Sequence, residues 1–457
     1  MSIRIYYIVV AIVVLSVGHG LGADSDPALI NRIDSYLEPY VQSGNFSGAV
    51  LVSKEGKILL EKAYGLADRE RKAPNEKTTR FHIASVSMQF TATAVLRLVD
   101  KGALRLNDSV GAYSVGITGA ERITVRDLLT EKSGLPDINS FSDYGNILAA
   151  HQTPSTLVSQ LQGHSLLFEP GTKFLHEEHS AYNLLALIVE KKTGLDFRRA
   201  MNQLVFQPAG MKSSGVDDDS VAGVEMAKGY QPEGLIGLKA ATQVHWSAKS
   251  GNGSGYTTVA DEARFVEQLF QGRLLGETSQ QTLLEASPRV GYGWFRGRNE
   301  RFDQIAFYMN GRAPGYASFV VYFPRERMTV VVLSNIYSSA TTSIGYDVAA
   351  ISQGLPYVAF HPLSPVASRG ENQSQTGNFR FGPDFYQPNA LISITANNGE
   401  LSLRWPDGSS SPLIPIDRDR FIDRSYWEAV ALERDNTGHP QVLTYGEFRG
   451  KAMGSEP

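Results

Sequence analysis

Short apolar runs mark strands near both ends of the first three quarters of the chain. Residues 48–52 are almost continuously apolar, residues 55–56 (Glu-Gly) give a turn signal, and residues 58–60 are apolar again, which is the pattern of a β-hairpin. Residues 318–323 and 328–333 are rich in valine and aromatic side chains, which favour strands. The pattern therefore predicts an early hairpin and two late strands.

Between these strands, apolar residues follow the spacing of helices. From Ser85 onward they recur three and four positions apart until Gly102, and glycine often ends a helix. Residues 181–192 carry a second stripe of this kind, which predicts a second helix. Strands at both ends of residues 24–354, with helices between them, favour an α+β domain in which helices cover an antiparallel sheet.

The last part of the chain has the pattern of strands alone. Residues 355–376 are polar and contain three prolines, so we interpret them as a linker. In residues 377–457, positions 391–394 and 401–405 alternate between apolar and polar, and the Asn-Gly pair at 398–399 is a hairpin turn signal. The chain is therefore expected to end in a small antiparallel β domain.

The composition is that of a soluble globular protein, with 42% hydrophobic and 20% charged residues among 457. This length allows one large and one small domain. The net charge of -4 gives no strongly basic surface, so we expect no nucleic-acid partner. The sequence has no cysteine, which excludes disulfides, thiol nucleophiles and cysteine-based zinc sites. We expect no cofactor.

The N-terminus has the layout of a cleavable signal peptide. Arg4 precedes an apolar stretch at residues 5–17, and small residues follow at 20–23. We therefore predict a signal peptide at residues 1–23 and a secreted or periplasmic protein with no stable membrane span after cleavage. The apolar stretch is shorter than the roughly 20 residues of a spanning helix; an uncleaved membrane anchor is the alternative.

A serine hydroxyl becomes a nucleophile only with a partner that takes its proton and with donors for the oxyanion that forms. A lysine three positions after a serine at a helix start meets the first need, because residues three apart share a helix face. Residues 81–92, around Ser85, resemble the nucleophile segment of the serine β-lactamase-related family. This family includes class C β-lactamases, DD-peptidases of the penicillin-binding-protein type and esterases. Further segments resemble the family in order over about 300 residues: residues 46–50, 64–68, 106–110, 123–129, 133–136, 169–174, 210–212, 292–294 and 314–316.

The resemblance implies a β-lactamase/transpeptidase-like fold and a serine hydrolase activity. Ser85 is then the candidate nucleophile, and the backbone N–H groups of Ser85 and Arg312 are the candidate oxyanion donors. Residues 377–457 resemble the small β domain that is often appended to these hydrolases. The expected partner is a small-molecule or peptide-like ligand in the cleft; no oligomeric state is predicted.

Two motifs of the family lack their basic residue here. The first should read Ser-x-x-Lys, but Met88 stands three residues after Ser85. The third should begin with Lys or His, but it reads Met309-Asn310-Gly311; its glycine remains, because a strand beside a ligand leaves no room for a side chain. A thioether fills the space of a lysine stem but accepts no proton, and general-base help is worth about 10²–10⁴ in rate.

The second motif, Tyr-x-Asn in the family, is also absent. The corresponding segment reads Leu-His-Glu-Glu-His-Ser, so the tyrosine position falls on His176 or Glu177 and the asparagine position on Glu178 or His179. His176, Glu177 and His179 are candidate replacement bases for the serine, and a polar loop that caps the next helix is the alternative. The spacing is His-x-x-His and not the His-Glu-x-x-His of helical zinc sites, so no metal site is predicted. Lys132 is a further amine that could serve the serine, with a solvated surface position as the alternative.

These features predict an exported protein of the β-lactamase-related serine hydrolase fold that is catalytically impaired. Met88 and Met309 make the cleft apolar, which favours an uncharged ligand over one that carries a carboxylate. Two alternatives remain open. The protein is an active serine esterase or peptidase that uses Ser85 with a base from residues 176–179, or it is a ligand-binding or interaction protein in which the C-terminal β domain carries the role.

Overall fold

The computed structural model describes residues 26–114, 116–175, 179–220, 225–285, 290–361, 372–397 and 399–453. The predicted signal peptide at residues 1–23 lies outside the described residues, and so do the candidate bases His176 and Glu177. None of the described helices has the length and apolar character that crossing a membrane requires.

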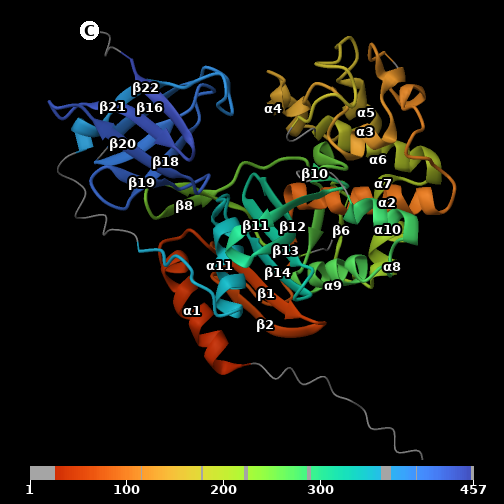
Figure 1. The fold of residues 1–457 in the computed structure, drawn as a ribbon, viewed down its shortest axis with the longest axis horizontal. Coiled ribbons are helices and arrows are strands. Elements are labelled where there is room, and N and C mark those ends of the chain that lie inside the picture. The colour runs from red at the N-terminus through yellow and green to blue at the C-terminus, as the bar shows by residue number, and fades with distance from the viewer. Residues whose placement is uncertain are drawn as a thin grey trace, which may run out of the picture.

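A seven-stranded antiparallel sheet forms the centre of the described chain (Figure 1). Its strands are, in spatial order, β10 (Val290–Gly291), β11 (Trp294–Asn299), β12 (Gln304–Ala313), β13 (Tyr316–Phe323), β14 (Met328–Ser334), β1 (Gly48–Lys54) and β2 (Lys57–Tyr64). The structure confirms β1 and β2 as the predicted hairpin and β13 and β14 as the predicted late strands. β1 pairs with β14 along its whole length, from Gly48 opposite Ser334 to Lys54 opposite Met328, so the two ends of the domain meet within the sheet.

Helices cover both faces of this sheet. The helices α1 (Pro27–Gln42) and α11 (Ala340–Ser352) pack on one face, and α9 (Val259–Phe270) packs on the other, with α2 (Met88–Asp100) in the same buried cluster. Val50 and Val52 enter the cluster of α1 and α11, whereas Ala49 and Leu51 enter that of α2 and α9, because successive side chains of a strand point to opposite faces. The predicted α+β arrangement of helices on an antiparallel sheet is confirmed.

The other described helices build a lobe beside the sheet. They are α3 (Val125–Leu129), α4 (Tyr144–Leu148), α5 (Pro154–Ser159), α6 (His179–Thr193), α7 (Phe197–Met201), α8 (Gln207–Ala209) and α10 (Glu277–Leu284). α6 confirms the helix predicted over residues 181–192. The helix predicted to begin near Ser85 is confirmed: a 3₁₀ turn at Ala84–Ser87 leads into α2, whose α-helical residues start at Met88.

The C-terminal strands close into an eight-stranded antiparallel barrel within the described residues (Figure 1). They are β15 (Gly377–Arg380), β16 (Leu391–Asn397), β17 (Glu400–Arg404), β18 (Ser410–Pro415), β19 (Arg420–Asp423), β20 (Ala429–Arg434), β21 (Pro440–Tyr445) and β22 (Phe448–Ala452). β15 pairs with β22, with Phe379 opposite Ala452, and this pairing closes the barrel. The predicted antiparallel β domain is confirmed, whereas its closure was not predicted.

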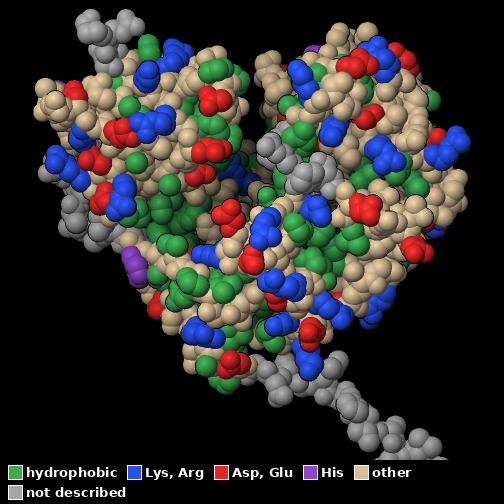
Figure 2. Space-filling view, in the orientation of Figure 1, with side chains coloured by type: hydrophobic (Ala, Val, Ile, Leu, Met, Phe, Trp, Pro, Cys, Tyr) green, Lys and Arg blue, Asp and Glu red, His purple; other side chains and the backbone are tan. Residues whose placement is uncertain are grey.

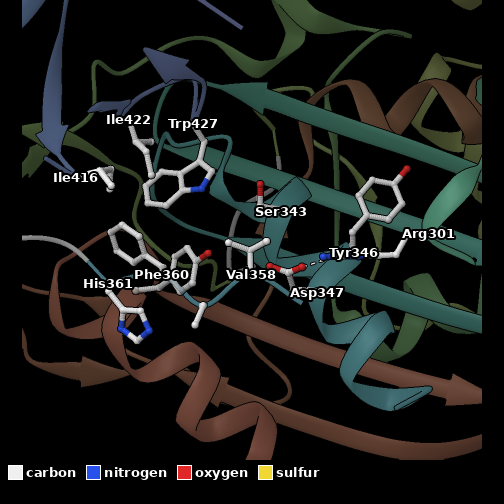
Figure 3. Close-up of a pocket in the computed structure, with 12 residues that line it drawn as sticks. Arg301, Ser343, Tyr346, Asp347, Val358, Phe360, His361, Ile416, Ile422 and Trp427 are labelled. Carbon is white, nitrogen blue, oxygen red and sulfur yellow. Dashed lines mark ion pairs between the residues drawn. The ribbon is translucent and has the colours of Figure 1, made fainter. Parts of the chain in front are cut away.

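The barrel packs against the larger domain, and a hollow lies on each side of this contact. On one side, Figure 2 shows a hollow between the barrel and the helical lobe. On the other side, a cavity of about 590 Å³ lies where α1, α11 and the barrel meet (Figure 3). There the Trp427 ring lies 5.4 Å from that of Tyr40 and 5.0 Å from that of Phe360, and Arg301 forms an ion pair of 2.7 Å with the buried Asp347. Aromatic packing therefore fixes the barrel against α1.

Candidate active site

Ser85 lies in a cavity of about 400 Å³ that segments from the whole chain enclose. The turn before α2, the start of α6, strand β12 and one loop of the barrel all contribute to its wall. The lining residues are Ser85, Met88, Glu131, Asn139, His179, Phe295, Met309, Asn310, Gly311, Arg312, Tyr337, Ser339 and Tyr426. A volume of this size is ordinary for a small-molecule site.

The backbone before Ser85 is held in a sharp turn. Strand β5 (Phe81–His82) pairs with β9 (Gly255–Thr257), and the Ser318 hydroxyl donates a hydrogen bond of 2.6 Å to the Ile83 carbonyl. Ala84 then has a φ of +49°, in the left-handed region that a non-glycine residue adopts only at a cost of about 1–3 kcal/mol. This turn places Ser85 in the wall of the cavity.

Strand β12 runs directly beside this turn at Gly311. A Cβ atom at that position would lie 2.4 Å from the Ile83 carbonyl oxygen and 2.9 Å from the Ser85 nitrogen, so only glycine fits. The close approach explains why the residue at this position is a glycine. The role of the Ser85 and Arg312 N–H groups as oxyanion donors stays a prediction.

Met88 and Met309, the two methionines that the sequence predicts at basic positions of the family, both line the cavity. Met88 is 2% exposed and Met309 is 4% exposed, and both belong to the main buried cluster of the larger domain. Among the described lining residues, the basic side chains are His179 and Arg312. Lys132 is absent from this lining, so the structure does not place its amine at Ser85.

Of the candidate replacement bases, His179 is the one that the structure describes, and it lines the cavity at the first residue of α6. Its Nδ1 atom lies 3.2 Å from the nearer carboxylate oxygen of Asp137. The Ser180 hydroxyl fixes this pair, since it donates to the Pro136 carbonyl at 2.7 Å and accepts from the Ile138 N–H at 2.9 Å. A carboxylate on Nδ1 selects the tautomer in which Nε2 is the basic nitrogen of the ring.

Lys249, which was not a candidate in the sequence analysis, lies near Asp137 and Tyr337. The Lys249 side chain is largely buried, and its ammonium donates a hydrogen bond of 3.0 Å to the Tyr144 hydroxyl. Burial lowers the pKa of Lys249, while Tyr337 and Asp137 act in the opposite direction. Asp137 and Tyr144 come from neighbouring segments and Lys249 from a distant one, and none of them carries a motif that would have marked it in advance.

The described residues hold no group of three or more histidine or acidic side chains that could bind a metal ion. What remains is a serine on a strained turn before a helix, set against an inner strand of an antiparallel sheet that helices cover on both faces. Together with the cavity that Ser85 lines, this arrangement defines the class of β-lactamases and penicillin-binding proteins.

The comparison with family models agrees with that class. The family model described as Beta-lactamase matches residues 33–351, and the chain belongs to this family. Among known relatives, penicillin-binding protein 4* of Bacillus subtilis is 26% identical over 418 residues, which cover 86% of this chain and 91% of that protein. Protein flp of Staphylococcus aureus is 26% identical over 323 residues, or 67% of this chain, and the matched part spans 63% of the length of that relative.

Solved structures extend the likeness to three dimensions. The penicillin-binding protein from Bacillus halodurans superposes with a TM-score of 0.61 and 28% identity, covering 71% of this chain and 99% of that chain. The octameric penicillin-binding protein homologue from Pyrococcus abyssi gives a TM-score of 0.64 at 20% identity and covers 92% of this chain and 99% of that one. The second likeness concerns the fold alone, and its coverage reaches into the barrel.

Proposed function

We propose that this protein binds a small-molecule or peptide-like ligand in the Ser85 cleft and is impaired in the acyl-enzyme chemistry of its family. The observation that carries the proposal is the pair of thioethers, Met88 and Met309, in the cavity wall. Neither side chain can take the proton of the Ser85 hydroxyl, and loss of a general base lowers the rate by about 10²–10⁴. We also propose that residues 1–23 are a signal peptide and that the mature protein is secreted or periplasmic.

Binding does not depend on the missing bases. The 400 Å³ cavity, the turn that carries Ser85 and the adjoining strand at Gly311 are all in place. These features support a cleft that still accepts a ligand of the size that the fold ordinarily binds. The domain limits that we propose are 24–354 for the larger domain, 355–376 for the linker and 377–457 for the barrel domain.

A second candidate function is slow hydrolysis of an ester or amide by Ser85 with His179 as its base. The pairing of His179 with Asp137 favours it. In this reaction the Ser85 oxygen bonds to the carbonyl carbon while its proton passes to the imidazole. The imidazolium then gives that proton to the leaving group, and water releases the acyl group by the same exchange. His176 and Glu177 stay alternative candidates for the base.

Covalent labelling tests both candidates. The purified protein is incubated with a fluorescent penicillin and with a fluorophosphonate probe, and the Ser85→Ala variant serves as control. Impairment predicts little or no penicillin labelling that depends on Ser85. The double variant Met88→Lys/Met309→Lys is expected to label at least about 100-fold faster than the natural sequence. Rapid, Ser85-dependent penicillin labelling of the natural sequence would contradict the impairment.

The fluorophosphonate arm separates the two candidates. If His179 is the base, labelling of Ser85 is slow and is lost in His179→Asn. Labelling that is unchanged in His179→Asn excludes His179 as the base. The absence of any Ser85-dependent labelling supports ligand binding without turnover.

A further inference from the structure

The side chain of Arg312 is a cation in the Ser85 cavity, and the barrel contributes to its placement. Its guanidinium carbon lies 3.6 Å from the centroid of the Tyr426 ring and 4.4 Å from that of the Tyr337 ring. Its Nη1 atom donates a hydrogen bond of 2.9 Å to the Ser425 carbonyl. Tyr426 and Ser425 belong to the loop between β19 and β20 of the barrel. Two of these three contacts therefore come from the C-terminal domain.

No ion pair between described residues includes Arg312, whose side chain contacts the two rings and the Ser425 carbonyl. Asp423, at the base of the same loop, is fully buried and accepts hydrogen bonds from the Ser425 and Tyr426 N–H groups at 2.9 and 3.1 Å. Burial raises the pKa of Asp423, whereas hydrogen bonds from the Ser411 hydroxyl, the two loop N–H groups and the Tyr445 hydroxyl lower it. The hydrogen-bond partners of this carboxyl thus lie within the barrel. The positive charge of Arg312 is thus held mainly by ring faces and a carbonyl, which leaves it available to a ligand.

The barrel loop is itself anchored to the larger domain. The fully buried Arg424 donates to the carbonyls of Gly237 at 2.9 Å and Gly44 at 3.1 Å, and to the Asn45 side chain at 2.8 Å. On the far side of the loop, Trp427 packs into the aromatic contact described above (Figure 3). A loop fixed from both sides presents Tyr426 to the cavity in one position.

We propose that the barrel loop, residues 424–427, is a wall of the Ser85 cleft that determines which ligands bind, because it holds the Arg312 guanidinium toward an anionic group of the ligand. The inference rests on the proposed ligand binding in this cleft. The expectation of an uncharged ligand was based on Met88 and Met309 and used only the backbone N–H of Arg312. We replace it with a ligand that carries an anionic group. In this proposal the Arg312 side chain supplies the positive charge that Met309 lacks. The barrel holds that side chain in place through Tyr426 and Ser425.

The absence of cysteine from the sequence allows a direct test that needs neither catalysis nor a known ligand. The substitution Ser85→Cys places a single thiol in the cavity. Its rates of reaction are measured with two methanethiosulfonates of similar size, one anionic (sulfonatoethyl) and one cationic (trimethylammonioethyl). The ratio of the two rates reports the sign of the charge beside position 85. Glu131 and His179 also line the cavity and stay unchanged in every variant, so ratios are compared between variants.

The structure predicts how this ratio changes. In the Ser85→Cys background, Arg312→Met is expected to lower the anionic-to-cationic ratio by roughly fivefold or more, as for loss of one nearby charge at a protein surface. Tyr426→Ala is expected to lower it in the same direction, because the guanidinium loses its nearer ring, whereas Tyr426→Phe keeps the ring and the ratio. Tyr386→Ala, which removes an exposed barrel tyrosine, is the matched control and should have no effect.

Two outcomes would overturn the inference: an unchanged ratio in Arg312→Met, or an unchanged ratio in Tyr426→Ala when thermal unfolding shows that variant to be folded. Neither outcome bears on the proposed catalytic impairment, which is tested separately by covalent labelling of the natural Ser85. Rapid penicillin labelling of Ser85 would contradict the impairment. It would not change the ratio of thiol reaction rates, which tests the roles of Arg312 and Tyr426.

Discussion

Replacing Glu262 by glutamine tests whether the protein keeps a proton buried behind the candidate nucleophile. Glu262 lies on α9 and is completely buried, and its Oε1 accepts a hydrogen bond from the amide of Gln89, the residue that follows Met88. Burial raises the pKa of Glu262 from 4.5 to about 8, the Gln89 hydrogen bond lowers it, and Asp261 raises it further. The folded protein therefore holds Glu262 neutral at pH values where the unfolded chain has lost the proton.

The sign and size of the effect follow from this pKa. Because the folded pKa lies above the unfolded one, the stabilisation is complete below pH 4.5 and is lost as the pH rises through about 8. The interval between 4.5 and about 8, at about 1.4 kcal/mol per pH unit, corresponds to about 5 kcal/mol. Glutamine keeps an acceptor for Gln89 but never charges, so Glu262→Gln should escape this loss.

The assay is the free energy of unfolding in urea, measured for both proteins from pH 5 to pH 8.5. The difference between them cancels groups that both share, including the buried His82, whose pKa burial lowers and whose effect on stability has the opposite pH dependence. We expect the two proteins to be similar near pH 5 and the variant to gain several kcal/mol by pH 8. A difference that stays constant over this range would refute a protonated Glu262.

Three further predictions concern the junction and the site. Arg424→Met leaves buried carbonyls without their donor, so we expect a loss of about 2–4 kcal/mol in stability and a separate barrel transition in calorimetry. Gly311→Ala, whose Cβ would meet the Ile83 carbonyl oxygen at 2.4 Å, should lower the melting temperature, whereas Gly297→Ala, with open space around it, should not. Lys249→Met should raise stability at pH 7 in urea titrations, and the gain should shrink toward pH 10, because a lowered folded pKa makes the buried ammonium most costly at low pH.

The parts of the fold that the sequence predicted are those with a local pattern. The hairpin of β1 and β2, the strands β13 and β14 and the helix α6 each carry their period within a few residues. The 3₁₀ geometry of the first turn before α2 was not predicted, because apolar spacing does not distinguish a 3₁₀ turn from the first turn of an α-helix. Barrel closure was not predicted, since alternation shows which face of a strand is buried but not which strands meet.

The residues of the candidate site also fall into those that the sequence predicted and those that it did not. Ser85, Met88, Met309 and Gly311 could be named in advance because the family resemblance places their segments in one cleft. The partners Asp137 and Tyr144 could not, because each is a single residue far along the chain from the side chain it contacts. Arg312 was chosen for its N–H group, and the position of its side chain depends on a tyrosine 114 residues away in another domain.

Met88 and Met309 line the same cavity, and the apolar character of each favours the apolar character of the other. A lysine at position 88 would place an ammonium in a site that is 2% exposed, where an unpaired charge is costly. That cost is tolerable only with polar neighbours, and here Met309 contributes a second thioether to the same cavity wall. An apolar side chain at one of the two positions therefore favours an apolar side chain at the other. A charge in this cavity is sustained more easily where ring faces hold it, as they hold Arg312, whose guanidinium lies against one ring of each domain.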